Sequence, residues 1–122
     1  MAKLGQYGHQ LHTMTAQEVL DVGVEHLLTQ MEKSEDNGAC QYDGGDVCCG
    51  ASPFLKKYSK GLDSNCFEWW QVVEEEYASS DHHILISGLQ SVHDGYDVVN
   101  WASALRELTT AEGLVYNGEQ YE

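Results

Sequence analysis

Basic residues are scarce in this sequence: six Lys and Arg side chains stand against twenty Asp and Glu side chains, a formal net charge of −14. A field of this sign repels nucleic acid phosphates and anionic membrane surfaces, so we expect no direct binding to DNA or RNA. It favours cationic partners, such as a basic protein surface, a metal ion or a protein groove that normally receives phosphates. The alternative is that the acidity serves solubility alone.

Long apolar runs are missing as well. No segment approaches the roughly 20 apolar residues that span a bilayer, and residues 1–14 lack the apolar stretch of a signal peptide. We therefore expect no membrane partner and a cytoplasmic location. Because cytoplasmic thiols are kept reduced, the four cysteines are expected to be free thiols.

Proline occurs only once, and with 42% hydrophobic residues and twelve aromatic residues the composition excludes a disordered chain. A chain of 122 residues has room for one core, and it shows neither an internal repeat nor a linker. We predict a single globular domain over residues 14–115. Residues 1–13 and 116–122 lack apolar periodicity, which predicts a flexible N-terminal arm and a flexible tail.

The spacing of apolar residues predicts a mostly α member of the α+β class, with about four to five helices and one small β-hairpin. The string Thr15-Ala16-Gln17-Glu18 fits a capping box that begins the first helix. Apolar residues then recur at intervals of three and four along about four turns. These residues are Leu20, Val24, Leu27, Leu28 and Met31.

The hairpin is expected after this helix. The run Glu35–Gly38 breaks the helical pattern, and residues 39–49 contain two short candidate strands. Between them, the composition of Asp43-Gly44-Gly45-Asp46 suits a tight turn. A hairpin this short is marginal by itself, so we expect it to pack on helices.

Four further helices are predicted from cap residues and apolar spacing. A short one begins at Ser52-Pro53 and ends at Gly61, and the next begins at Ser64. Another runs from Asp81 through His93, and the last from Asp97 until Gly113. Residues expected to face the core are Phe54, Leu55, Tyr58, Cys66, Trp69, Trp70, Val73, Tyr77, Leu85, Ile86, Leu89, Val92, Val98, Trp101, Ala102, Leu105 and Leu108.

Catalytic motifs are absent from the sequence, which has no serine-hydrolase elbow, no phosphate-binding glycine loop and no His-Glu-x-x-His pair. A nucleophilic cysteine needs a lowered pKa, whereas acidic surroundings raise the pKa of a thiol. Twenty carboxylates make a close pair a chance event, and Asp36, Asp43 and Asp46 lack the spacing of an EF-hand. We therefore expect a protein that is not an enzyme.

Cys40, Cys48, Cys49 and Cys66 are the weak candidates for a metal site, in which thiolates alone or thiolates with His82 or His83 hold zinc. The spacing argues against zinc. Ligand pairs of structural zinc sites are usually two to four residues apart, whereas Cys40 and Cys48 are eight apart and Cys48 and Cys49 are adjacent. We expect no cofactor, and we keep a small zinc-binding or regulatory domain as the alternative.

Carboxylates and large aromatic rings adjoin in one segment. Glu74, Glu75 and Glu76 follow Trp70 closely, and Asp81 comes shortly after them. This mixture suits the binding of a basic protein surface, and these five residues are the predicted partner-binding site. The alternative is a solvated helix face that covers a tryptophan-rich core.

Half of the basic residues stand within five positions, at Lys56, Lys57 and Lys60. Such a cluster can meet an acidic patch on a second copy of the chain, which would make the protein a homo-oligomer or a virion component. An ordinary polar helix face accounts for the cluster equally well.

Five segments, in order along the chain, form a recognisable pattern: Thr15–Gln30, Cys40-Gln41-Tyr42, Cys48-Cys49-Gly50, Leu89-Gln90 with His93-Asp94, and Trp101 with Leu105-Arg106-Glu107-Leu108 and Gly113-Leu114. In these segments the chain resembles a family of small uncharacterised proteins from bacteria and their phages. The sequence departs from the pattern at Gly50-Ala51-Ser52-Pro53, where the family continues with apolar residues. The resemblance implies structural motifs rather than an activity, and a setting of phage or mobile-element DNA in which small acidic proteins block host enzymes.

These observations predict a non-enzymatic, acidic, phage-type binding protein. Its expected action is to block a basic, nucleic-acid-binding surface of a host protein of defence or replication, through carboxylates and aromatic rings.

Overall fold

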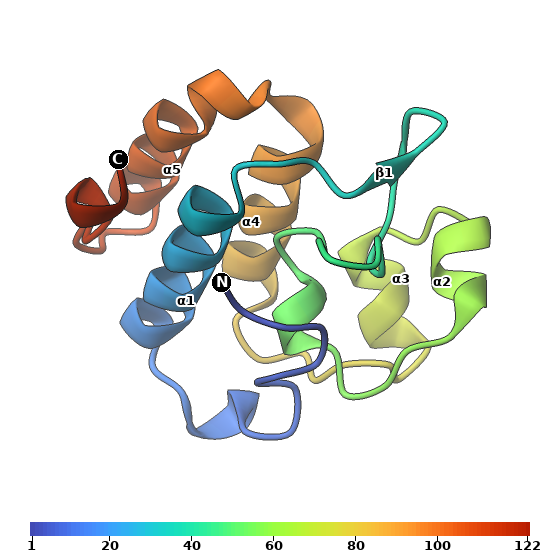
Figure 1. Ribbon diagram of the computed structural model, residues 1–122. Helices are drawn as coiled ribbons and strands as arrows, with labels where there is room; N and C mark the ends of the chain where they lie inside the picture. Colours follow the sequence, from blue (N-terminus) through green and yellow to red (C-terminus); the bar gives the residue numbers. More distant parts are fainter.

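The computed structural model describes residues 1–122, and its long helices are α1 (Ala16–Gln30), α4 (His83–Gly95) and α5 (Trp101–Ala111). These three helices pack against one another and form one side of the molecule (Figure 1). The other side holds the hairpin, α2 (Lys60–Ser64) and α3 (Trp69–Glu74). With five helices and one two-stranded antiparallel sheet, the predicted mostly α, α+β fold is confirmed.

Helix α1 begins at the predicted capping box. The Thr15 hydroxyl accepts a hydrogen bond from the Glu18 amide at 3.1 Å, and the Glu18 carboxylate accepts one from the Thr15 amide at 2.9 Å. Both bonds satisfy amides that a helix start leaves without partners. The predicted apolar stripe is buried, except that Met31 lies past the helix end in a left-handed conformation and is exposed.

Close contact between the helices depends on glycines. A Cβ atom on Gly23 of α1 would lie 2.5 Å from the Leu89 side chain of α4, and one on Gly88 of α4 would lie 2.5 Å from Leu108 of α5. Larger residues would therefore push the helices apart, which outweighs the cost of a glycine in a helix interior. The largest fully buried side chains of the core are Trp69, Trp101, Phe54, Leu11, Leu20, Leu27, Leu55, Leu62, Ile86, Leu89 and Leu105.

The hairpin forms earlier in the chain than predicted. Strands β1 (Glu35–Asp36) and β2 (Ala39–Cys40) pair with Asp36 opposite Ala39, so the turn is Asn37-Gly38. Both turn residues have positive φ, 52° and 83°, the conformation that two-residue hairpins demand and that Asn-Gly adopts readily. The predicted turn at residues 43–46 joins no strands, so that prediction was wrong.

The predicted helix from Ser52 to Gly61 is in fact two elements. Residues Ser52–Phe54 form a single 3-10 turn, η2, after which Leu55 is extended. The Ser59 hydroxyl then caps α2 by accepting a hydrogen bond from the Gly61 amide at 3.3 Å, which places Gly61 inside a helix instead of at its end. Phe54 and Leu55 are buried as predicted.

The starts of the next two helices also differ from the prediction. Ser64 is the last residue of α2, and α3 begins later, with Glu68 as its cap. Asp81 does not cap α4: the helix follows His82, whose ring nitrogen Nε2 donates to the Met14 carbonyl oxygen at 2.7 Å. A long-range bond thus overrides the local capping preference of aspartate.

Helix α5 begins after a 3-10 turn, η3 (Val98–Asn100), and ends as predicted at Gly113, which has a φ of +67°. The Leu114 amide donates to the Thr109 carbonyl at 3.0 Å and the Gly113 amide donates to the Thr110 carbonyl at 3.1 Å. This pair of bonds is a Schellman motif, in which glycine is the favoured residue at the left-handed position.

Residues 1–13 pack on the domain instead of forming a free arm. The Gly5 amide donates to the Ser52 carbonyl at 2.9 Å, the Tyr7 amide donates to the Pro53 carbonyl at 2.8 Å, and Leu11, in the 3-10 turn η1 (Leu11–Thr13), is fully buried. A Cβ atom on Gly8 would lie 1.8 Å from the Leu55 carbonyl oxygen. Gly8 therefore permits a close backbone contact with Leu55 that a larger residue would prevent.

The C-terminal residues are likewise packed rather than free. The 3-10 turn η4 (Glu119–Tyr121) contacts α1, and Tyr116 and Tyr121 pack against the core cluster. Arg106 of α5 makes an ion pair with Glu122 at 2.6 Å and lies over the Tyr116 ring. The prediction of a flexible tail rested on apolar periodicity alone, and apolar periodicity gives no signal for contacts of this kind.

Candidate functional site

A cavity of about 240 Å³ lies between the hairpin, the connection from α2 to α3, and α4. Residues 39–42 form one wall, and residues 62 and 66–68 form another. Cys49 lines it as well, and α4 contributes Gln90 and Asp94. Most of the lining is apolar, and its polar side chains come from Gln41, from Glu68 and from α4, so the cavity combines an apolar interior with a few polar groups.

Two polar side chains hold the walls of this cavity together. The Gln90 amide nitrogen donates to the Tyr42 hydroxyl at 2.6 Å, and that hydroxyl donates to the Phe67 carbonyl at 2.9 Å. The Gln90 carbonyl oxygen accepts from the Trp69 amide at 3.1 Å. Burial raises the pKa of Tyr42 above its ordinary value, so the phenol stays protonated and keeps its donor. The cavity is therefore a fixed feature of the fold.

Cys40, His93 and Asp94 gather at one edge of the cavity, with their potential ligand atoms within 4.8 Å of one another. The buried His93 ring accepts a hydrogen bond at Nε2 from the Ser34 amide at 2.9 Å. Because an amide can only donate, the ring proton is on Nδ1, which donates to the Asp94 carboxylate at 2.6 Å. Both ring nitrogens are thus engaged.

This cluster lacks the properties that nucleophilic catalysis requires. Burial, and then the adjacent Asp94 carboxylate, raise the pKa of the Cys40 thiol to about 12. A nucleophilic cysteine needs a lowered pKa and a histidine nitrogen free to take its proton. The arrangement instead uses His93 to anchor the backbone at Ser34.

The same hydrogen bonds make the cluster a poor zinc site. A zinc ion on Nδ1 of His93 would leave the ring proton on Nε2, where it would face the Ser34 amide, donor against donor. The other cysteines do not complete a ligand set. The Cys48 sulfur lies 3.6 Å from His26, the Cys49 sulfur lies 3.2 Å from the Ser52 hydroxyl, and Cys66 is exposed on the cavity rim.

The two histidines considered as zinc ligands lie elsewhere. His82 is bonded to the Met14 carbonyl, and His83 lines an open groove of about 470 Å³ between α3 and α4. The structure therefore places neither of them with the cysteines.

This groove is continuous with the cavity, because Glu68, Gln90 and Asp94 line both. Trp69 and Trp70 stand on the α3 side, and small residues of α4, Ser87, Ser91 and Gly95, line the other side. Two carboxylates and no lysine or arginine line the groove. Cavity and groove together form a hollow, negatively charged path across this face.

The predicted partner-binding residues lie along α3 and after it: Trp70 is in the first turn, Glu74 is the last helical residue, and Glu75, Glu76 and Asp81 follow. Trp70 is 51% exposed, and its indole nitrogen donates to the Glu68 carboxylate at 2.9 Å, whereas Trp69 is buried. The prediction that both tryptophans face the core was therefore wrong for Trp70. Glu74 follows Trp70 by four residues and so shares its helix face.

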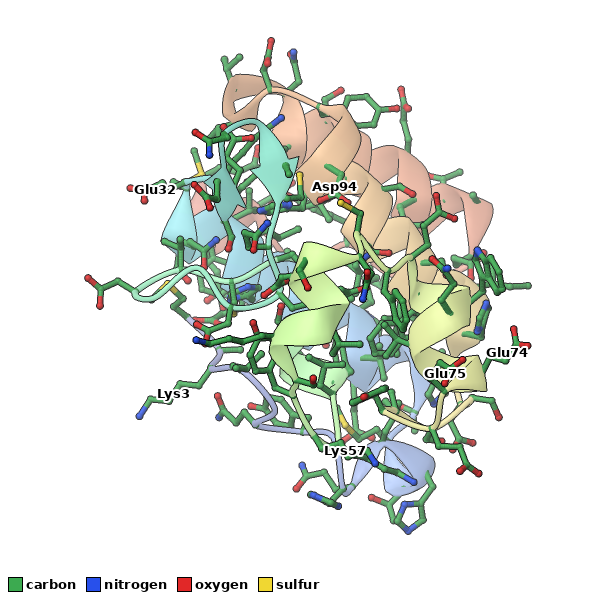
Figure 2. All side chains as sticks on the ribbon, turned by 90° about the vertical axis from the view of Figure 1, so that its right-hand side faces the viewer. Lys3, Glu32, Lys57, Glu74, Glu75 and Asp94 are labelled. Atoms are coloured by element: carbon green, nitrogen blue, oxygen red, sulfur yellow. The ribbon has the colours of Figure 1, made fainter.

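Glu74, Glu75 and Glu76 are exposed, and so is Asp81, which accepts a hydrogen bond from the Ser79 hydroxyl. Figure 2 shows Glu74 and Glu75 at one end of this face, with Asp94 near the hairpin at the other end. The structure therefore adds a second acidic position to the one that the sequence indicated.

Helix α3 ends in the same Schellman motif as α5. The Tyr77 amide donates to the Val72 carbonyl at 2.9 Å and the Glu76 amide donates to the Val73 carbonyl at 3.0 Å. The left-handed position, however, holds Glu76, with a φ of +63°, where glycine is favoured. The three glutamates also stand at the negative end of the helix dipole.

The lysine cluster makes no ion pair within the chain. Lys56 and Lys57 are exposed, and the Lys57 ammonium lies 5.0 Å from the centre of the Tyr77 ring. Figure 2 shows Lys57 below Glu75 on the same face, so the cluster adjoins the acidic end of α3 without neutralising it.

Sequence reasoning placed neither Gln90 nor Asp94 in a site. Gln90 and Asp94 are four residues apart on one face of α4, so their spacing in the sequence was a signal that could have placed them together. Tyr42 and Cys40 reach the same cavity only through the placement of the hairpin.

Comparison with known proteins gives no indication of the function. The chain matches no model of a protein family, no curated protein and no solved structure. None of its helices combines the length and the apolar character that crossing a membrane requires.

Proposed function

We propose that this chain is a non-enzymatic binding protein that covers a basic protein surface with the face formed by α3, α4 and the hairpin. In the cell it would act by occupying a surface of a host defence or replication protein that otherwise binds nucleic acid phosphates. The four cysteines are all free thiols, as expected of a protein in the reducing cytoplasm, where we propose that this one acts.

The observation that carries the proposal is the end of α3. Glu74, Glu75 and Glu76 oppose the helix dipole, and Glu76 takes a left-handed conformation that costs a non-glycine residue about 1 kcal/mol. Solubility alone requires no such placement, because exposed carboxylates serve it anywhere on the surface. Residues that oppose local stability are typical of sites selected for binding.

The rest of the charge distribution supports the same proposal. Only three of the twenty carboxylate side chains, those of Glu25, Glu119 and Glu122, have an ion-pair partner within the chain, since the His93 ring that bonds Asp94 is neutral. The exposed Trp70 adds a large amphipathic ring on the same helix as Glu74, and tryptophan is enriched at interface hot spots. A basic partner would therefore meet both unneutralised charge and apolar area.

The test compares two variants of equal net charge. In the first, Glu74, Glu75 and Glu76 are all changed to Gln, and in the control Glu32, Glu107 and Glu112 are changed to Gln. The probe is a fluorescent arginine-rich peptide, and its affinity is measured by anisotropy at about 50 mM and about 500 mM salt.

We expect the α3 variant to lose at least about tenfold in affinity at low salt, and the control to lose less than about threefold. We also expect wild-type affinity to fall steeply at high salt, because screening weakens contacts between exposed charges. Equal losses in the two variants, or an affinity that salt does not change, would contradict the proposal.

A further inference from the structure

We propose that the cavity beneath the hairpin receives one arginine side chain of the basic partner, while the adjoining segment of that partner lies in the α3–α4 groove. This inference rests on the proposed function and names the recognition site within it.

The first support is the position of the cavity. Glu68, Gln90 and Asp94 line both the cavity and the groove, so a segment in the groove passes directly over the cavity mouth. The small residues Ser87, Ser91 and Gly95 leave space for a backbone on the α4 side. A side chain of that segment can turn into the cavity without any change in the fold.

The second support is size. A volume of about 240 Å³ lies below the usual range of roughly 300–1,000 Å³ for pockets that hold drug-sized ligands. It suits a single long side chain better than a nucleotide or a cofactor. The walls are fixed by the Gln90–Tyr42–Phe67 hydrogen bonds, so the space is preorganised.

The third support is chemistry. Leu62, Phe67 and Tyr42 offer apolar and aromatic surface to an aliphatic stem, and the Asp94 and Glu68 carboxylates stand where a cationic head would reach. Asp94 has no cationic partner within the chain: the neutral His93 ring donates to one of its oxygens at 2.6 Å, and the Cys40 thiol adjoins the carboxylate. No lysine or arginine of this chain lines the cavity.

Arginine fits these features better than lysine. Its planar guanidinium is weakly hydrated, stacks on aromatic rings and donates from several nitrogens in a fixed fork, whereas an ammonium is a compact and strongly hydrated charge. Aromatic walls and two separate carboxylates therefore favour the guanidinium.

The experiment uses the full chain and two peptides, an arginine-rich one and a copy in which every arginine is lysine. Asp94→Asn removes the charge but keeps an oxygen that accepts from His93, and Asp97→Asn is the matched control, since Asp97 is exposed and lines neither the cavity nor the groove. Ala39→Phe fills the cavity without changing charge. Circular dichroism and thermal unfolding check that each variant is folded.

We expect Asp94→Asn to weaken the arginine peptide about tenfold and Asp97→Asn less than about twofold. We expect Ala39→Phe to weaken it at least as much as Asp94→Asn, and wild type to bind the lysine copy at least about fivefold more weakly. If Ala39→Phe does not fold, the comparison of Asp94→Asn with Asp97→Asn tests the inference alone.

Wild-type affinity in both Asp94→Asn and Ala39→Phe overturns the inference. If the variant with glutamines at 74, 75 and 76 still loses affinity in that case, the proposed function stands without the arginine site. If wild type fails to bind either peptide at low salt, the proposed function is overturned together with the inference.

Discussion

The helical region, formed by α1, α4 and α5, and the connecting region, residues 31–82, are held in place by different forces. In the helical region, buried apolar side chains meet across helices, as Leu89 does over Gly23. In the connecting region the regular elements are short, and polar side chains of α1 and α4 bind its backbone. Apolar periodicity builds the first region, and long-range hydrogen bonds position the second.

Helix α1 provides one set of these bonds. The His26 ring donates from Nε2 to the Cys48 and Cys49 carbonyls at 3.1 and 3.2 Å. The Gln30 amide donates to the Cys48 carbonyl at 2.9 Å and accepts from the Cys48 amide at 3.0 Å. Helix α4 adds His93, which binds the Ser34 amide, and Gln90, which binds the Trp69 amide. These bonds attach the connecting region to α1 and α4, and so fix the position of the segments that line the cavity.

The largest effect is expected from Asp63→Ala, which breaks the connecting region from within. The buried Asp63 carboxylate accepts from the Tyr42 amide at 2.6 Å, from the Asp43 amide at 3.3 Å and from the Tyr58 hydroxyl. Its removal leaves buried donors without partners, so we expect the free energy of unfolding to fall by about 3 kcal/mol in urea denaturation. Asp46→Ala, at an exposed position of the same segment, is the control and should change it by less than about 0.5 kcal/mol. Equal effects would mean that this carboxylate does not hold the region.

A smaller effect is expected from pH, through the bond that ties α1 to the connecting region. Burial lowers the pKa of His26 from its ordinary 6.5, and its Nδ1 atom has no partner, so the folded protein holds the ring neutral. The unfolded chain takes up a proton below about pH 6.5 and the folded chain does so only at lower pH. Stability is therefore full above pH 6.5 and declines as the pH falls below it, by at most about 1.4 kcal/mol per pH unit.

Urea denaturation of wild type and His26→Gln at pH 7.5 and 5.5 measures this effect. Wild type should lose about 1 kcal/mol more between the two pH values than the variant does, whereas the exposed His12→Gln should behave like wild type. If His26→Gln keeps the whole wild-type loss, another group is responsible.

The smallest effect is expected from substitutions at two helix ends, one in each region. Glu76, which follows α3, and Gly113, which follows α5, occupy equivalent left-handed positions, with φ of +63° and +67°. We expect Glu76→Gly to raise the free energy of unfolding by about 0.5 kcal/mol, and Gly113→Ala to lower it by about 1 kcal/mol. Thermal unfolding measures both. A Glu76→Gly variant that is more stable yet binds the arginine-rich peptide more weakly would separate binding from stability at this residue, and one that is less stable would refute the assigned cost.

Much of the helical region could be predicted from the sequence. Three of its features were predicted: the capping box at Thr15 and Glu18, the apolar stripe of α1, and the end of α5 at Gly113. Each is caused by residues that lie only a few positions away in the chain. Local capping bonds and a 3.6-residue period are written into neighbouring positions, so one stretch of sequence contains the whole signal.

The candidate site was harder to predict. The exposed glutamates after Trp70 were found because charge and aromatic residues adjoin in the chain. The cavity was not found, since its walls come from residues 39–42, 49, 62, 66–68, 90 and 94. The hairpin was misplaced because Asn37-Gly38 was interpreted only as a helix breaker, although the same pair is a strong hairpin turn signal.

The sequence by itself determined the acidity, the fold class and the helices with strong local patterns, because composition, caps and periodicity act over short distances. Only the tertiary structure decided that residues 1–13 pack on Ser52 and Pro53, that Trp70 is exposed while Trp69 is buried, and that Cys40, Gln90 and Asp94 share one cavity. Each of these outcomes depends on a hydrogen bond or a close contact between residues far apart in the chain, and no local pattern encodes which of many such partners is chosen.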